Sequence, residues 1–271
     1  MTEQQWERCT AYSESGGVTK SMTLLSLAVA CAEENPDDEV IVGDCDPRGA
    51  VTKWTGVQPR EPGLHIGAIF GNDDVEGWAE ELAIRPDPAG GWPANLRVIP
   101  SDRKLSNQEK TADDHANIRL LRSTEGVRAR LFFDSPNRQG GLIIQNILTA
   151  INGIIYAAKP NEDGLDGVDG AKETVRKYRD HRRSLRLPDN FQEIGIVLGA
   201  AWRGAVWTRD ALRAVDEFER TSPGMLIRPF IPDRVIVPES RSAGVWYGQY
   251  EGGKPVYDAY RKIYNEKVRA S

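Results

Sequence analysis

The chain has 271 residues, of which 39% are hydrophobic and 28% are charged, and its formal net charge is -5. This length allows a substantial buried core, and the composition is ordinary for a globular protein in water. The acidic balance argues against a surface coated in basic residues, but it allows a local basic patch. No long apolar run predicts a membrane span, and residues 1–12 lack the apolar stretch of a signal peptide. Because the three cysteines form no C-x-x-C pair, we expect a reduced, cytoplasmic protein.

Along the chain, short apolar runs that end in Gly, Asp, Pro or Ala alternate with longer stretches of helical periodicity. A short candidate strand covers residues 8–12, and apolar runs cover 40–42, 96–99, 131–133, 154–157 and 194–198. Helical patterns cover 20–34, 141–151, 167–186, 208–220 and 255–268. Continuous apolar runs are typical of strands buried on both faces, and strand–helix alternation favours right-handed crossovers. The sequence therefore predicts an α/β fold with a doubly wound, mostly parallel sheet and helices on both faces.

The stretch around residues 58–115 departs from this alternation. It is rich in residues that break regular elements, namely Pro59, Pro62, Pro86, Pro88, Pro93 and Gly90-Gly91. We interpret it as an irregular insertion of surface helices and loops between core strands. No linker divides the chain, so we expect a single domain over residues 1–271 that contains this insertion.

The central motif is a glycine-containing segment at residues 13–21, between the first candidate strand and a clear helix. Its sequence is S-E-S-G-G-V-T-K-S. Gly16 and Gly17 would let the backbone approach an anion, whose charge is favoured at a helix N-terminus. In a phosphate loop of this kind, Lys20 would reach the terminal phosphates and the Ser21 hydroxyl would bind Mg²⁺. The residues expected to contact a nucleotide are Gly16, Gly17, Val18, Thr19, Lys20, Ser21 and Met22.

The match to the standard pattern G-x-x-x-x-G-K-[ST] is incomplete, because Glu14 and Thr19 occupy its glycine positions. A glycine-rich turn that only caps a helix is the alternative. Carboxylates farther along favour the phosphate loop: Asp44 and Asp46 follow one predicted strand, and Asp134 ends another. Since the carboxyl ends of parallel strands form the ligand edge of an open sheet, we expect these groups near one Mg²⁺–phosphate site. Solvated turn aspartates are the alternative for the first two.

In order and sequence, these motifs resemble the ParA family of deviant-Walker ATPases, which shares its fold with MinD and the nitrogenase iron protein. The family motifs K-G-G-x-G-K-[ST], D-x-D-P-Q-G and D-x-P-P correspond here to residues 15–21, 44–49 and 134–137. Further matches are an N-L-x-x-I-P-S strand at 95–101, Asn146, and segments 230–234 and 238–240, which resemble the I-P-R…S-E-A region beside the base. The resemblance covers nearly the whole chain, from about Arg8 to Val268.

This resemblance implies a plasmid or chromosome partition protein that binds ATP or ADP with Mg²⁺ and forms an ATP-dependent homodimer. It also implies nonspecific DNA binding, control by a ParB-like centromere-binding partner, and a cytoplasmic location that becomes nucleoid-associated in the ATP-bound state. Lys20 and Asp46 would be catalytic, with Asp46 orienting the attacking water. The residues implied to hold the metal are Ser21, Asp44 and Asp134, and those implied beside the base are Pro232 and Arg234.

Two residues of the phosphate loop depart from the family pattern. Ser15 stands where the family has its signature lysine, which reaches the phosphates bound by the other subunit. Loss of such a charged contact costs on the order of several kcal/mol of transition-state stabilisation. Thr19 precedes the loop lysine, where a β-branched residue suits the backbone only if φ is not positive. We therefore expect a weak ATPase, unless another basic residue replaces the lysine. The alternative is a nucleotide-gated dimerisation module with little or no hydrolysis.

Two groups of basic residues are candidates for contact with DNA phosphates. One lies on the predicted helix at 167–186 and the other toward the C-terminus; they comprise Arg176, Lys177, Arg182 and Arg183, and Arg234, Arg241, Arg261 and Lys262. A solvated charged face is the alternative for the helix. The last predicted helix carries Tyr257, Tyr260 and Tyr264, which suit packing better than the Leu- or Phe-rich face of a membrane anchor. We therefore expect no membrane partner.

Overall fold

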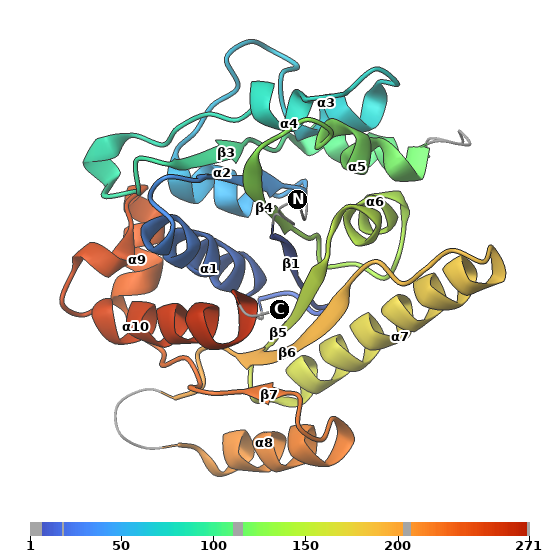
Figure 1. Ribbon diagram of the computed structural model, residues 1–271. Helices are drawn as coiled ribbons and strands as arrows, with labels where there is room; N and C mark the ends of the chain where they lie inside the picture. The colour runs from blue at the N-terminus through green and yellow to red at the C-terminus, as the bar shows by residue number, and fades with distance from the viewer. Residues whose placement is uncertain (1–6, 18, 111–115, 203–206, 270–271) are drawn as a thin grey trace.

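A central parallel β-sheet organises the molecule, as Figure 1 shows for the computed structural model. The structure describes residues 7–17, 19–110, 116–202 and 207–269. Within these residues the sheet has seven strands in the order β3-β2-β4-β1-β5-β6-β7, and all neighbouring pairs are parallel. Their bounds are β1 Arg8–Tyr12, β2 Glu39–Asp44, β3 Leu96–Ile99, β4 Ala129–Asp134, β5 Gly153–Ala158, β6 Gln192–Leu198 and β7 Leu226–Ile227. The predicted α/β fold with a parallel sheet is confirmed.

Helices cover both faces of this sheet (Figure 1). Side chains of α1, α2, α9 and α10 pack on one face, and those of α3 to α8 pack on the other. The helix bounds are α1 Lys20–Glu34, α2 Ala50–Thr55, α3 Ile66–Gly71, α4 Trp78–Glu81, α5 Arg119–Ser123, α6 Leu142–Ala150, α7 Glu162–Ser184, α8 Arg209–Thr221, α9 Ile236–Ala243 and α10 Lys254–Ile263. Because both faces are covered, the central strands are continuous apolar runs, and every residue of β5 is buried.

The central strands end level with one another at their carboxyl ends. Asp134, the last residue of β4, is in register with Ala11 on β1 and with Asp44 on β2. The loops that follow β1, β2 and β4 therefore leave the sheet side by side. In open parallel sheets this edge is where ligands bind.

The largest difference from the predicted helices is the start of α7. The predicted start at residue 167 was wrong, because α7 begins at Glu162. Asn161 caps it: the Asn161 side chain accepts a hydrogen bond from the Gly164 amide at 2.9 Å. Glycines within the first turns hid this start, since glycine weakens a helical pattern. At the C-terminus, α10 ends at Ile263, and the π-helical turn Tyr264–Val268 completes the segment predicted as one helix.

The C-terminal helical segment packs on α1. The side chains of Tyr257, Tyr260 and Tyr264 are buried, and the Tyr260 hydroxyl lies 3.0 Å from the Thr23 hydroxyl on α1. The predicted packing role of these tyrosines is confirmed. Across the described ranges, no helix combines the length and apolarity needed to cross a bilayer.

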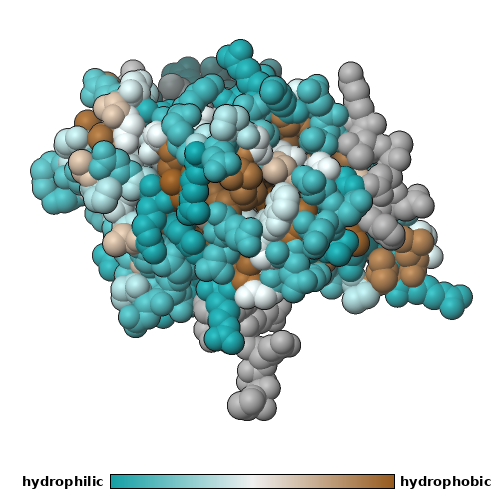
Figure 2. Space-filling model, turned by 90° about the horizontal axis from the view of Figure 1, so that it is seen from above, coloured by the Kyte–Doolittle hydropathy of each residue, from teal (hydrophilic) through white to brown (hydrophobic). Residues whose placement is uncertain are grey.

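The segment predicted to be irregular consists of short elements around β3, at the top of Figure 1. Besides α3 and α4 it contains 3₁₀ turns at Pro88–Gly90 and Arg103–Lys110. Figure 2 views this side of the molecule and shows a mostly hydrophilic surface with hydrophobic residues in a central hollow. Ile66, Ile69 and Phe70 of α3 are fully buried, so this segment packs against the core of the sheet.

Candidate functional site

The glycine-containing loop connects β1 to α1 and lies against α7. The Glu14 amide donates to the Gly167 carbonyl oxygen at 3.0 Å, and the Ser15 hydroxyl donates to the Asp163 carbonyl oxygen at 2.6 Å. A Cβ atom on Gly167 would come within 2.5 Å of the Ser15 hydroxyl, so this close approach requires glycine. The loop is therefore seated on the first turns of α7. Val18, predicted to contact the nucleotide, lies outside the described residues.

Thr19 adopts a backbone conformation that favours glycine. Its φ is 71° and its ψ is 14°, which places it in the left-handed region at the N-cap of α1. A residue with a side chain costs roughly 1–2 kcal/mol in this conformation. The Thr19 hydroxyl is buried and has no hydrogen-bond partner among the described residues, and a Cβ on Gly199 would lie 2.8 Å from the Thr19 Cβ. The loop thus has the positive φ that the family's glycine allows, and Gly199 provides space for the threonine side chain.

Lys20 is the first residue of α1, and its side chain is buried. Its Nζ donates to the Ser15 carbonyl oxygen at 2.9 Å. Burial lowers the pKa of Lys20 to about 8, although the nearby carboxylates of Asp134 and Asp46 oppose this shift. The nearby carboxylates therefore do not fully balance the positive charge of Lys20. An anion bound at the helix N-terminus would stabilise this charge further.

Ser21 and Asp134 lie in direct contact. The Ser21 hydroxyl donates to Asp134 Oδ2 at 2.6 Å, while Asp134 Oδ1 is buried and has no partner among the described residues. Burial, followed by the charge of Asp44, raises the pKa of Asp134 well above its ordinary value. A buried carboxylate oxygen without a donor is costly unless a cation or a proton satisfies it. The hydroxyl and this oxygen are therefore suitable ligands for Mg²⁺, which typically uses one or two protein groups together with phosphate oxygens and water. The described residues contain no group of three or more His, Cys, Asp or Glu side chains that could hold a metal ion.

Asp44 and Asp46 have different surroundings. Asp44 Oδ2 accepts hydrogen bonds from the Thr52 amide at 2.8 Å and the Thr52 hydroxyl at 2.7 Å, so it holds the start of α2. Burial raises the pKa of Asp44 to about 6, against the effect of these hydrogen bonds. Asp46 faces the cavity described below, and its Oδ1 accepts a hydrogen bond from the Arg48 amide at 2.9 Å. Of the residues implied to hold a metal, the structure brings Ser21 and Asp134 together, whereas Asp44 supports α2.

A cavity of about 890 Å³ opens beside the loop and the strand ends. It is lined by most of the residues predicted to contact a nucleotide, namely Gly16, Gly17, Thr19, Lys20, Ser21, Met22, Pro232 and Arg234. Further basic residues complete its wall: Arg48, Lys53, Arg103, Lys159 and Arg241. A concave site with many cations and a helix N-terminus favours a ligand with several negative charges.

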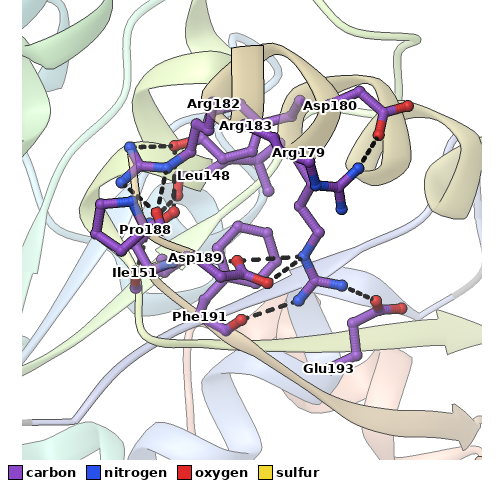
Figure 3. A network of polar contacts seen from close by, with 12 residues as sticks. Leu148, Ile151, Arg179, Asp180, Arg182, Arg183, Pro188, Asp189, Phe191 and Glu193 are labelled. Carbon is purple, nitrogen blue, oxygen red and sulfur yellow. Dashed lines mark hydrogen bonds and ion pairs between the residues drawn. The ribbon is translucent and has the colours of Figure 1, made fainter. Parts of the chain in front are cut away.

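The basic residues of α7 are engaged by acidic and carbonyl groups, which Figure 3 shows at close range for part of the helix. The ion pairs within the helix are Arg176–Glu173 at 2.7 Å, Arg176–Asp180 at 2.8 Å, Lys177–Glu173 at 3.4 Å and Arg183–Asp180 at 2.8 Å. Arg182 instead donates to the Pro188 carbonyl oxygen at 2.8 Å. The first predicted DNA-contact group is thus paired with groups of its own helix and of the connection to β6.

The second predicted DNA-contact group is divided between two places. Two of its members form ion pairs, Arg261 with Glu34 at 2.6 Å and Lys262 with Glu266 at 3.7 Å. Arg234 and Arg241 instead line the cavity. In the part of the chain that the structure describes, neither of these two arginines pairs with an acidic side chain.

Ser101, which is not among the predicted site residues, holds the frame of the site. The Ser101 hydroxyl donates to the Asp46 carbonyl oxygen at 2.7 Å, and its amide donates to the Thr52 hydroxyl at 2.8 Å. Its position directly after a predicted strand was the available signal. Asn146 has a structural role, because its side-chain oxygen accepts a hydrogen bond from the Leu120 amide at 3.0 Å in the core.

Comparison with known proteins identifies structural relatives. No protein-family model matches the chain, and no curated protein sequence matches it significantly. McdA from Cyanothece has a TM-score of 0.77 at 18% identity, over 95% of this chain and 99% of that chain. A plasmid partition protein from Borrelia burgdorferi bound to AMPPNP has a TM-score of 0.73 at 17% identity, over 97% and 99% of the two chains. Cobyrinic acid a,c-diamide synthase from Mycobacterium smegmatis, with bound ATP analog and magnesium, has a TM-score of 0.71 at 19% identity, over 96% and 93%. The chain therefore has the fold of these proteins, which is the fold implied by its resemblance to the ParA family.

Proposed function

We propose that this chain is an ATP-binding partition ATPase that forms an ATP-dependent homodimer on nonspecific DNA, under the control of a ParB-like centromere-binding protein. The observation that supports this function best is the convergence at the N-terminus of α1 of Lys20, Ser21 and Asp134 Oδ1, which has no partner among the described residues. The ligands named for the structural relatives, AMPPNP and an ATP analog with magnesium, belong to the class that such a site binds.

In this proposal each polar group has a defined task. Ser21 and Asp134 would hold Mg²⁺, which would neutralise phosphate charge. Lys20 and the amides of the loop bind phosphate oxygens. Asp46, on the cavity wall, orients a water molecule toward the terminal phosphorus. Attack by this water forms one P–O bond and breaks the bond to the bridging oxygen, so that the products are ADP, inorganic phosphate and a proton released to solvent.

A second function is favoured by the phosphate loop itself. Ser15 carries no charge, and its hydroxyl is bound to the Asp163 carbonyl oxygen. Without a charged contact at this position the transition state is stabilised less than it would be with a lysine, whereas the loop can still bind the ground state. The second function is therefore a nucleotide-gated dimerisation module in which ATP acts as a ligand and is turned over little or not at all.

The two functions are separated by measuring assembly and turnover on the same protein. We expect AMPPNP with Mg²⁺, but not ADP, to convert the chain to a dimer in light scattering and to retain it on sonicated double-stranded DNA. Phosphate release from ATP that is slow but abolished by Lys20→Ala supports the ATPase. Dimerisation without phosphate release supports the binding module. If the unmodified chain fails to bind ADP or AMPPNP in calorimetry, both functions are wrong.

A further inference from the structure

The phosphate loop lacks a cation at position 15, and the structure shows where the Ser15 side chain lies. Its hydroxyl is bound to the Asp163 carbonyl oxygen, and its Cβ would lie 2.7 Å from a Cβ placed on Gly167. Ser15 is therefore packed on α7, and it is absent from the lining of the cavity. A second positive charge on the terminal phosphate, beside that of Lys20, has to come from another wall of the site.

Arg48 is held at the opposite wall by a fixed turn. It follows Asp46 and Pro47 after β2, where the family motif D-x-D-P-Q-G has glutamine. The Asp46 side chain accepts a hydrogen bond from the Arg48 amide at 2.9 Å, and the Asp46 carbonyl oxygen accepts one from the Gly49 amide at 2.8 Å. The Ser101 hydroxyl donates to the same carbonyl oxygen at 2.7 Å. These bonds fix the backbone of Arg48 at the wall of the cavity.

The charge of Arg48 is available to a ligand. Its side chain is exposed and lines the cavity, and no acidic side chain among the described residues pairs with it. Lys20 lines the same cavity. Two cations that repel each other across a cavity both gain from an anion bound between them.

Lys159 is the rival for this role. It follows β5, is half-buried and also lines the cavity. A guanidinium group presents paired donors that match two oxygens of one phosphate, whereas an ammonium group acts as a point charge, so Arg48 suits the terminal phosphate better than Lys159.

We propose that Arg48 holds the terminal phosphate of the bound nucleoside triphosphate in its own subunit, and so replaces the lysine that is absent at position 15. This inference rests on the proposed nucleotide function. It concerns the terminal phosphate, to which Arg48 would add a second positive charge beside that of Lys20.

The test compares the dissociation constants of AMPPNP and ADP, each with Mg²⁺, for the unmodified chain and for R48Q, R48K and K159Q. In R48Q we expect AMPPNP affinity to fall about ten- to a hundredfold, as for loss of a charge-assisted hydrogen bond. ADP affinity should change less than about threefold, since ADP lacks the terminal phosphate. R48K keeps the charge without the paired donors, so its AMPPNP affinity should lie between those of R48Q and the unmodified chain.

ADP binding in R48Q also shows that the variant is folded and that its loop is intact. An AMPPNP-to-ADP affinity ratio in R48Q equal to that of the unmodified chain overturns the proposal. A ratio that falls in K159Q but not in R48Q also overturns it, and assigns the role to the lysine. If the unmodified chain binds neither nucleotide, the proposed nucleotide function fails first and this inference fails with it.

Discussion

Two regions of this molecule are rich in basic residues, and they differ in what surrounds the charges. On α7, the side chains of Arg176 and Arg183 are 60% and 78% exposed, yet both pair with Asp180. At the cavity, Arg48, Arg234 and Arg241 converge on one hollow, and none of them forms an ion pair with an acidic side chain of the described residues. The helix thus neutralises its own charge, whereas the cavity leaves its charge for a ligand.

This difference shows why a count of basic residues does not by itself indicate where unpaired positive charge gathers. Exposed ion pairs contribute little to stability, about 0–1 kcal/mol, but they reduce the field that a distant anion experiences. Unpaired cations around a concave surface add their potentials inside it. The basic helix is conspicuous in the sequence, whereas the cavity draws its cations from several separate segments of the chain.

The largest expected difference between the two regions is a loss of folding stability when Arg179 of α7 is substituted. Its side chain is 23% exposed, pairs with Glu193 and with Asp189 at 3.0 Å, and donates to the Phe191 carbonyl oxygen at 2.9 Å (Figure 3). Arg179→Ala should lower the free energy of unfolding by about 2 kcal/mol, because it leaves these partners unsatisfied. Urea unfolding measures the change. Arg183→Ala is the matched control and should change the free energy of unfolding by less than about 0.5 kcal/mol. A tenfold loss of ADP affinity in Arg179→Ala would show that α7 belongs to the ligand site.

The next largest expected effect is a loss of ADP affinity at the cavity as the pH rises. In the free protein the pKa of Lys20 is lowered to about 8, chiefly by burial. Bound phosphate favours the charged form and raises this pKa, so the bound state takes up a proton above pH 8. Titration of Lys20 should therefore leave the ADP affinity in EDTA unchanged below pH 8. Above pH 8 it should lower this affinity by up to about tenfold per pH unit. Calorimetry from pH 7 to 10 checks this dependence. Lys20→Arg, which stays charged, should give a flat profile, and an equally steep profile in that variant would assign the titration to another group.

The sequence predicted the parallel sheet, because strands buried on both faces leave continuous apolar runs. Most of the residues predicted to contact a nucleotide line the cavity. The sequence did not predict the start of α7, since the glycines that let the phosphate loop approach this helix weaken the helical pattern. It also could not separate Asp44 from Asp134 as metal ligands. That distinction depends on the hydrogen bonds from Thr52 to Asp44, which join segments whose relative placement only the fold determines.

A smaller effect is expected from Thr19, where the cavity region stores strain that α7 does not have. Thr19→Gly should raise the free energy of unfolding by about 1 kcal/mol. Relief of the left-handed conformation, roughly 1–2 kcal/mol, exceeds the added chain entropy of glycine, roughly 0.5–1 kcal/mol. Gly199→Ala provides the matched test, because its Cβ would collide with Thr19. This substitution should destabilise the unmodified chain more than the Thr19→Gly variant. Additive effects in urea unfolding would contradict the contact.

The smallest effect is expected from neutralising the exposed cations of α7. Arg176→Gln combined with Arg183→Gln should change nonspecific DNA affinity less than about threefold, because each arginine already faces an acidic group of its own helix. The slope of log affinity against log salt should also stay nearly constant, since each phosphate contact that is lost lowers it by about 0.9. Fluorescence anisotropy with a short duplex at saturating AMPPNP measures both quantities. Arg241→Gln is the contrasting variant, because Arg241 has no such acidic partner among the described residues, and we expect it to lower the slope by about one. If the α7 variant lowers the slope by two while Arg241→Gln leaves it unchanged, the paired helix and not the cavity rim is the DNA-binding surface.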